Sequence, residues 1–318
     1  MLQENLLKKM HKITCVVPVY NESTHIVDFI NDLIFELKNI SNLIEIIIVN
    51  DGSSDTTAIK LKAFELNSDI KYIELSRNFG KESAITAALP YVSGDCCFIM
   101  DSDYQHPFKY LEIMYDYWVE GFDIAYTYII NRESEAFFTK TCKSIYYKYL
   151  LNPDKISIPR DAGDFRLLDI RVIKSLILLK EKNRYMKGLY SWVGYRSIGV
   201  PYSPDVRKAG VSKFRLFDLV GLAIDGIVSF STKPLIYSIF IGLFIAIFSF
   251  IYAIYIIYDT FANGVAVGGW PSIIVSIMFF SGVQLFFVGI LGIYIGKIYE
   301  ESKNRPIYLI DHKNSYNI

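Results

Sequence analysis

Two closely spaced carboxylates carry the clearest chemistry in this sequence. Asp101 and Asp103 stand two residues apart at the end of an apolar run, and Gln105 repeats the spacing. If the backbone turns there, both carboxylates face one cleft, where such a pair is costly without a cation. A divalent ion takes oxygen ligands of this kind and leaves positions for phosphate oxygens. The predicted chemistry is stabilisation of negative charge on a departing diphosphate, and a capped turn without metal is the alternative.

Three further polar clusters follow apolar runs in the same way. They occupy residues 18–22, 50–55 and 76–82. Each cluster alone could be a turn that caps a helix, because Asp, Asn and Ser favour such positions. Four clusters at successive strand ends favour one shared ligand site instead. His106, which precedes Pro107, is interpreted as a turn residue rather than a ligand.

The elements that must position these clusters alternate between strands and helices. Apolar, β-branched runs predict strands, and amphipathic stretches between them predict helices. The strands are expected at 13–20, 44–50, 70–75 and 96–101, and the helices near 24–39, 55–67 and 82–89. This alternation predicts an α/β domain with a mostly parallel sheet and right-handed crossovers. In such sheets ligands bind beyond the C-terminal ends of the strands.

Two long runs near the C-terminus carry no charge. They extend from Leu235 to Tyr258 and from Trp270 to Ile295. A helix over the first run is ~36 Å long, which exceeds the ~30 Å of a bilayer core. Buried core helices are the alternative. Lys and Arg flank the pair but are absent from 259–269, which predicts that both ends of the pair lie in the cytoplasm.

Composition limits the function classes. The 318 residues include 33 basic and 33 acidic side chains, and this balance disfavours a nucleic-acid binder. A hydrophobic fraction of 52% is high for a soluble enzyme and favours a soluble part joined to a membrane part. The four cysteines lack metal-ligand spacing and are interpreted as buried thiols. Residues 1–12 are polar and basic, so no signal peptide is expected.

The chain is predicted to divide into six segments. A stretch before the first apolar run is interpreted as a helix on the membrane surface, with an ordinary core helix as the alternative. In order, the segments are a cytoplasmic catalytic domain (1–213), a juxtamembrane amphipathic helix (214–234), a first transmembrane helix (235–258), an extracytoplasmic linker (259–269), a second transmembrane helix (270–295) and a cytoplasmic tail (296–318).

Over residues 12–309 the sequence resembles the inverting family-2 glycosyltransferases with a GT-A fold. More narrowly, it resembles the polyprenyl-phosphate glycosyltransferases of the bactoprenol glucosyltransferase and dolichol-phosphate mannose synthase type. The matching motifs are PVYNE, NDGSSD, SRNFGKE, DxDxQxP, DAGDFRLLD (161–169), RYMKGLYSWVGY (184–195), RKAGVSKF (207–214) and DGIVSFSTKPL (225–235). The resemblance implies a Rossmann-like nucleotide-sugar domain followed by a two-helix transmembrane hairpin.

The resemblance also implies roles for individual residues. A nucleotide cradle would be formed by Pro18, Tyr20, Glu22, Val49 and Asp51, with Ser102 beside the nucleotide. Mg²⁺ or Mn²⁺ would be held by Asp101, Asp103 and Gln105.

Arg207 and Lys213 would close over the donor diphosphate, and Arg132 would meet the acceptor phosphate, although the match is poorer between residues 126 and 140. Asp164 would act as the catalytic base or orient the acceptor, with a role as partner of Arg166 as the alternative.

The implied reaction is an inverting, metal-dependent hexosyl transfer to undecaprenyl phosphate. UDP-glucose is the favoured donor, and GDP-mannose, UDP-GlcNAc and UDP-4-amino-arabinose stay open. The product would feed O-antigen, lipopolysaccharide or another cell-envelope glycan from the cytoplasmic face of the inner membrane. A non-catalytic scaffold or flippase subunit is the alternative class. Expected partners are the nucleotide sugar, the lipid phosphate and the bilayer, without nucleic acid, and a homo-oligomer stays open.

Overall fold

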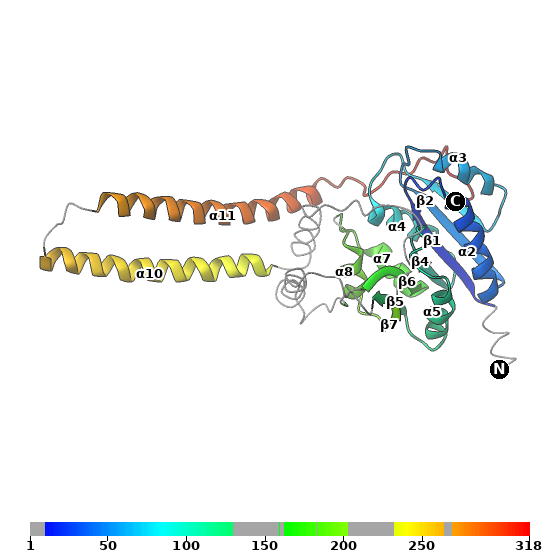
Figure 1. The fold of residues 1–318 in the computed structure, drawn as a ribbon, viewed down its shortest axis with the longest axis horizontal. Helices are drawn as coiled ribbons and strands as arrows, with labels where there is room; N and C mark the ends of the chain where they lie inside the picture. Colours follow the sequence, from blue (N-terminus) through cyan, green and yellow to red (C-terminus); the bar gives the residue numbers. More distant parts are fainter. Residues whose placement is uncertain (1–9, 130–158, 160–161, 183, 203–231, 264–268) are drawn as a thin grey trace.

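A seven-stranded mixed sheet forms the centre of the N-terminal part of the chain (Figure 1). The computed structural model describes residues 10–129, 159, 162–182, 184–202, 232–263 and 269–318. In these residues the strand order is β3-β2-β1-β4-β6-β5-β7. The strands are β1 (Lys12–Val19), β2 (Leu43–Asn50), β3 (Ile70–Glu74), β4 (Cys96–Ile99), β5 (Ile124–Ile129), β6 (Ala162–Asp169) and β7 (Ser197–Tyr202).

The first four strands are parallel, as the sequence predicts, and β6 changes the direction. β1 pairs in parallel with both β2 and β4, and β2 pairs in parallel with β3. β6 is antiparallel to both β4 and β5. The predicted α/β class with a mostly parallel sheet is therefore confirmed. The antiparallel strand that makes the sheet mixed was not anticipated.

Helices cover both faces of the sheet, which is why the central strands are apolar on both sides. One face carries α2 (Ile26–Ile40) and α5 (Lys109–Val119), and the other carries α4 (Lys81–Ala88), α7 (Ile170–Leu178) and α8 (Met186–Trp192). The buried side of α2 follows the helical period, with Ile26, Phe29, Ile30, Leu33 and Leu37 turned to the core. Each such side chain contributes about 1.5–3 kcal/mol. The helix expected near 55–67 is α3 (Thr57–Leu61) followed by the 3₁₀ turn η1 (Lys62–Phe64).

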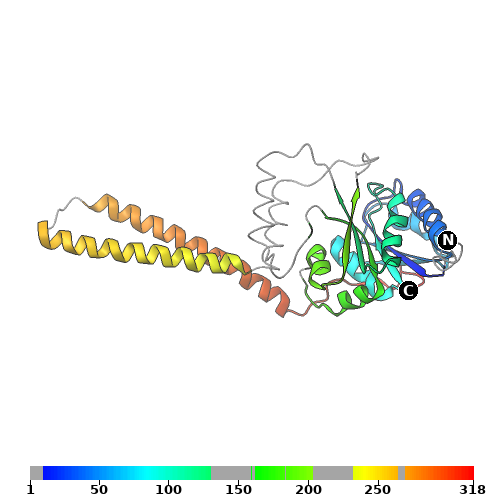
Figure 2. The ribbon, with the colours of Figure 1, turned by 90° about the horizontal axis from the view of Figure 1, so that it is seen from below.

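The two apolar runs form two long helices that lie side by side and extend away from the sheet (Figures 1 and 2). They are α10 (Lys233–Asn263) and α11 (Trp270–Ser302), and each continues beyond the uncharged run that predicts it. Both are long and apolar enough to cross a membrane, and within the described residues their most apolar windows contain no buried position. Core helices would be buried, so the geometry is that of a hairpin with its apolar surface exposed.

The tail after α11 returns to the sheet. Tyr316 forms an antiparallel bridge to Tyr72 of β3, and Ile310 bridges Leu75. The Tyr316 hydroxyl also donates to the Leu61 carbonyl over 2.8 Å. The tail thus covers β3, the strand at one edge of the sheet, and supplies partners to backbone groups that an edge strand leaves open. A packed tail was not part of the sequence prediction.

Several predicted features lie outside the described residues. They are most of the amphipathic segment 214–234, the centre of the linker 259–269, and the basic residues Arg132, Arg207 and Lys213.

Candidate active site

A cleft of about 290 Å³ opens where β1, β2 and β4 end. Its position agrees with the rule that ligands bind at the carboxyl edge of parallel strands. Seven of the residues predicted from sequence line it: Pro18, Tyr20, Glu22, Asp51, Asp101, Ser102 and Asp103. Val49 is elsewhere, fully buried in the core between the sheet and α4. Gln105 lies beyond the lining and contacts the cleft through Asp103.

The loop after β1 and the loop after β2 are joined at Asn21. Asn21 adopts φ 57°, a left-handed conformation that Asn tolerates better than most residues. Its backbone N–H donates to Ser53 Oγ over 2.9 Å, and its side-chain oxygen accepts from the N–H of Ser54 over 2.8 Å. These bonds fix the two loops that carry Tyr20, Glu22 and Asp51.

Gly52 allows the third loop to approach the second. Gly52 has φ 64°, and a Cβ at this position would lie 2.4 Å from the carbonyl carbon of Arg77 and 2.6 Å from the nitrogen of Asn78. No side chain fits in that space. Beside it, Asp51 accepts hydrogen bonds from the N–H groups of Phe79 over 2.7 Å and Gly80 over 2.9 Å. Asp51 therefore holds the third loop, and the start of α4, against the cleft.

Lys81 at the start of α4 bridges two carboxylates that are far apart in sequence. Its Nζ lies 2.7 Å from Asp101 Oδ1 and 2.7 Å from Asp164 Oδ2. The antiparallel register pairs Ile99 of β4 with Arg166 of β6, and two residues further it brings Asp101 opposite Asp164. Lys187 of α8 approaches Asp164 from the other side, with Nζ 3.7 Å from Oδ1.

This ion network keeps both carboxylates charged. Burial alone would raise the pKa of Asp101, but the charge and hydrogen bond of Lys81, together with His106, whose Nε2 lies 3.8 Å away, hold it well below its usual range. Burial likewise opposes ionisation of Asp164, and the charges of Lys81 and Lys187 outweigh it, so its pKa is also lowered. The pKa of Lys81 is raised, because Asp101 and Asp164 outweigh the effect of its burial. All three groups are therefore ionised at neutral pH.

Asp103 lies beside this network in a tight turn. Tyr104 has φ 58°, which reverses the chain so that Gln105 faces Asp103. The backbone N–H of Gln105 donates to Asp103 Oδ1 over 3.1 Å, and its side-chain amide donates to Oδ2 over 2.5 Å. In this arrangement Gln105 orients Asp103 through its nitrogen.

The donor set fits a hard divalent cation. Asp101 and Asp103 supply carboxylate oxygens at the cleft, as Mg²⁺ and Mn²⁺ prefer. The charges of Asp103 and Asp101 reach Glu22, whose pKa is raised by burial and by these neighbours despite the opposing charge of His25. No group of three or more His, Cys, Asp or Glu side chains positioned for a metal occurs in the described part of the chain. The two aspartates would therefore need oxygen ligands from the donor or water.

Sequence reasoning assigned no role to Lys81, Lys187 or Glu82. Lys81 stands in one of the four polar clusters, and Lys187 stands in the motif RYMKGLYSWVGY (184–195), so a signal was available for both. Glu82 is enclosed behind the network, and burial together with the charge of Asp164 raises its pKa to about 8. Arg166 donates to the Gly163 carbonyl and lies over the Tyr190 ring at 4.5 Å.

The ion pairs of Asp164 are formed with Lys81 and Lys187. The alternative in which Asp164 serves as the partner of Arg166 is thus not favoured by the contacts. The predicted roles of Arg132, Arg207 and Lys213 concern residues outside the described ranges.

The part of the chain that lines this cleft lies within a region that matches a known protein family. The profile of the family described as "Glycosyl transferase family 2" matches residues 14–177, which include every strand of the sheet except β7 and the start of β1. A solved structure of glucosyl-3-phosphoglycerate synthase from Mycobacterium tuberculosis with Mn²⁺ and UDP-glucose aligns with a TM-score of 0.47 and 19% identity, covering 72% of this chain and 81% of that chain.

Two relatives match over nearly their whole length. An uncharacterised glycosyltransferase of Synechocystis sp. is 38% identical over 300 residues, covering 94% of this chain and 94% of that protein. The bactoprenol glucosyl transferase of Shigella phage SfV is 40% identical over 308 residues, covering 95% of this chain and 99% of that protein. The family profile and the near full-length relatives show that the chain is a glycosyltransferase and belongs to glycosyltransferase family 2.

Proposed function

We propose that this glycosyltransferase transfers glucose from UDP-glucose to undecaprenyl phosphate at the cytoplasmic face of the inner membrane, with inversion at the anomeric carbon. The observation that carries the proposal is the joining of a carboxylate cleft and two exposed apolar helices in one chain. A lipid phosphate acceptor needs both, because its headgroup must reach the cleft while its tail stays in the bilayer. The 40% identical relative named as a bactoprenol glucosyl transferase supports this acceptor.

The residues of the cleft suit the leaving group. Asp101 and Asp103 would hold Mg²⁺ or Mn²⁺, and Pro18, Tyr20, Glu22, Asp51 and Ser102 would surround the nucleotide. The bound ion would neutralise charge on the departing diphosphate. In the proposal Arg207 and Lys213 add positive charge over the diphosphate, and Arg132 meets the acceptor phosphate.

Asp164 is proposed to orient the acceptor rather than remove a proton from it. A phosphate monoester has a second pKa of about 6 and is largely dianionic at pH 7, so it is already a nucleophile. Two lysines hold the pKa of Asp164 low, which makes it a weak base. Lys81 is proposed to fix Asp164 relative to Asp101, so that acceptor and donor sites keep one geometry.

The hairpin is proposed to cross the membrane twice, with the catalytic domain and the tail on the cytoplasmic side. Lys233 precedes α10, and Lys297, Lys303 and Arg305 stand at or after the end of α11, which agrees with positive charge on the inside. The tail after α11 is bonded to β3, which supports a hairpin whose second flank lies on the side of the catalytic domain.

The test is incubation of membranes containing the full chain with undecaprenyl phosphate and, separately, UDP-glucose, GDP-mannose, UDP-GlcNAc and UDP-4-amino-arabinose. Mass measurement of the lipid should show one added hexose with UDP-glucose, and no added hexose with the Asp103→Ala variant. Product with another donor alone would reassign the sugar. Absence of any product lipid, with donor hydrolysis intact, would overturn the lipid acceptor.

A further inference from the structure

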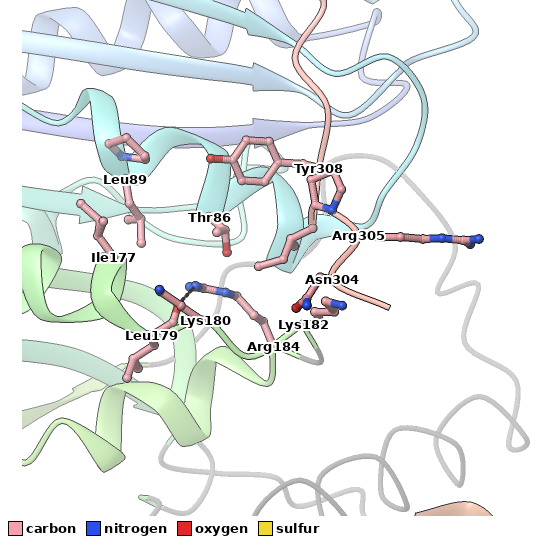
Figure 3. A pocket seen from close by; sticks show the side chains of 13 residues that line it. Thr86, Leu89, Ile177, Leu179, Lys180, Lys182, Arg184, Asn304, Arg305 and Tyr308 are labelled. Atoms are coloured by element: carbon pink, nitrogen blue, oxygen red, sulfur yellow. Dashed lines mark hydrogen bonds between the residues drawn. The ribbon is translucent and has the colours of Figure 1, made fainter. Parts of the chain in front are cut away.

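A second cavity, of about 340 Å³, lies where the catalytic domain meets the end of α11. Its walls come from α4 and the 3₁₀ turn after it (Leu89–Tyr91), from the end of α7 and the loop after it, and from residues 304–308 of the tail (Figure 3). It shares no lining residue with the active-site cleft. We refer to it as the junction cavity.

The junction cavity is lined by cations without carboxylates. Lys180, Lys182, Arg184 and Arg305 belong to its lining, which includes no Asp or Glu, and the Arg305 side chain extends away from the other three (Figure 3). Within the described ranges none of these four side chains forms an ion pair. Leu89, Ile177 and Leu179 add apolar surface to the wall. A cavity of this composition selects an anion that carries an apolar portion.

Arg184 is the buried member of the set. It is 8% exposed, and its guanidinium donates to the backbone carbonyls of Leu176, over 3.5 Å, and Leu179. Its Nε has no hydrogen-bond partner among the described atoms. Burial lowers the pKa of Arg184 against the opposing charge of Glu181. The described hydrogen bonds of the Arg184 guanidinium go to carbonyl groups and not to a carboxylate, so its charge can attract an anion in the cavity.

Lys182 ties the cavity to the second apolar helix. Its Nζ donates to the carbonyl oxygens of Glu300, over 3.0 Å, and Glu301, over 2.7 Å, in the last turn of α11. Its backbone N–H donates to Glu301 Oε1 over 2.8 Å. A lysine at this position satisfies the open carbonyls of the helix C-terminus. The cavity is therefore held at the depth where α11 ends.

We propose that the junction cavity binds the phosphate group of an anionic membrane phospholipid. The proposal rests on the membrane placement of α11 in the proposed function. The end of a spanning helix lies at the headgroup level, where a cluster of basic side chains meets lipid phosphates. The lipid bound here would be a structural ligand that fixes the domain on the hairpin, because the cavity is separate from the cleft.

The experiment measures lipid binding to the full chain in neutral detergent. The probes are dihexanoyl phosphatidylglycerol, dihexanoyl phosphatidylcholine and inorganic phosphate, and bound lipid is counted by native mass spectrometry. The test variant is Lys180→Glu with Arg305→Glu, both exposed lining residues. The control is Lys174→Glu with Lys313→Glu, which are exposed, lie in α7 and the tail, and change net charge equally without lining the cavity.

Phosphatidylglycerol should bind the wild type and the control variant with the same affinity. Its affinity for the test variant should be lower by about tenfold or more. Equal binding to test and control variants would overturn the proposal. Equal binding of phosphatidylcholine would show that the site does not select an anionic lipid, and inorganic phosphate binding as tightly would assign it to a soluble anion. Either result overturns the assignment. Hydrolysis of the sugar donor by each variant checks that the variant is folded. The binding assay contains no sugar donor, so the outcome of the binding assay is independent of the transfer reaction.

Discussion

The active-site cleft and the junction cavity differ in how their charges are compensated, although helix α4 contributes to both. At the cleft, the ammonium group of Lys81 lies within 2.7 Å of two carboxylates. At the junction cavity, Lys182 and Arg184 instead meet backbone carbonyls. The cleft is therefore acidic with an internal cation, whereas the cavity is basic with no internal anion.

This difference separates the two regions by the ligand that each can accept. A carboxylate cluster with one lysine can still take a divalent cation and, through it, a diphosphate. A cluster of cations without a carboxylate in the lining takes a phosphate directly. Changes at Asp103, Lys81 and Asp164 test how the charges of the cleft are compensated, and a change at Glu82 tests the buried carboxyl beside them.

The largest effect is expected from Asp103→Ala. Loss of a group that helps to stabilise leaving-group charge costs at least ~3 kcal/mol of barrier, so the transfer rate should fall by ~100-fold or more. Asp103 is half-buried in a surface turn, and the apparent melting temperature should stay near that of the wild type. Asp28→Ala, an exposed aspartate of α2 that does not line the cleft, is the matched control. Near-normal turnover in EDTA would contradict the metal assignment.

Lys81→Met removes the internal cation of the cleft. Asp101 and Asp164 would then face each other without the bridge, and the pKa of both should rise. We expect the transfer rate to fall roughly 10- to 100-fold, with a new loss of activity toward acidic pH as the carboxylates take up protons.

Lys81→Arg should restore part of the rate, because it keeps the charge, while Lys174→Met on α7 should behave as the wild type. A pH profile identical to that of the wild type in Lys81→Met would show that Lys81 does not control these carboxylates.

Asp164→Asn separates a base from an orienting group. If Asp164 orients the acceptor, the rate should fall by about tenfold, less than the ~100-fold typical of a lost general base. The loss should then appear in the acceptor KM as much as in kcat. With Asp164 ionised throughout, the rate should rise through about pH 6 with the acceptor phosphate and then stay flat in both proteins. A variant rate that climbs with hydroxide while the wild type is flat would establish proton removal by Asp164.

The smallest effect is expected at Glu82, which lies between the two regions and whose charge is felt by Arg184. Its pKa is about 8 in the folded chain, compared with an ordinary value of 4.5, so the folded state binds the extra proton between these values. The contribution of Glu82 to the free energy of unfolding is therefore complete below about pH 4.5. It decreases as the pH rises through the pKa of about 8, so the folded state becomes less stable.

Glu82→Gln should remove this loss and raise the apparent melting temperature at pH 8.5 by about 2–4 °C, with little change at pH 4.5. Thermal denaturation in detergent at both pH values measures it. Glu112→Gln, an exposed residue of α5, should show no such difference. A stabilisation equal at both pH values would exclude titration of Glu82 as its cause.

Much of the cleft followed from the sequence because its parts are local. The loops after β1, β2 and β4 each carry their polar residues directly behind an apolar run, and parallel strands end at one edge. Glu22, Asp51, Asp101 and Asp103 were therefore expected together, and they line one cleft. The same local reading did not place Val49, which a buried strand turns to the core.

The contacts of Asp164 with Lys81 and Lys187 could not be predicted from the local sequence. Asp164 stands 63 residues after Asp101 in the sequence, and only the antiparallel pairing of β6 with β4 brings it opposite. The position of Lys81 Nζ depends on that pairing and on the helix start that Asp51 holds. No spacing in the chain encodes a distance between strands that are not neighbours in sequence.

The sequence by itself determined the alternation of strands and helices, the carboxylate pair after the fourth strand and the two long apolar helices, since each depends on residue type and period over a short span. Only the tertiary structure decided that β6 enters the sheet antiparallel, that the tail returns to cover β3, and that Lys180, Lys182, Arg184 and Arg305 line one cavity. The physical reason is that these outcomes depend on hydrogen bonds and packing between segments far apart in the chain. Their free energy arises from surfaces that meet only in the folded state.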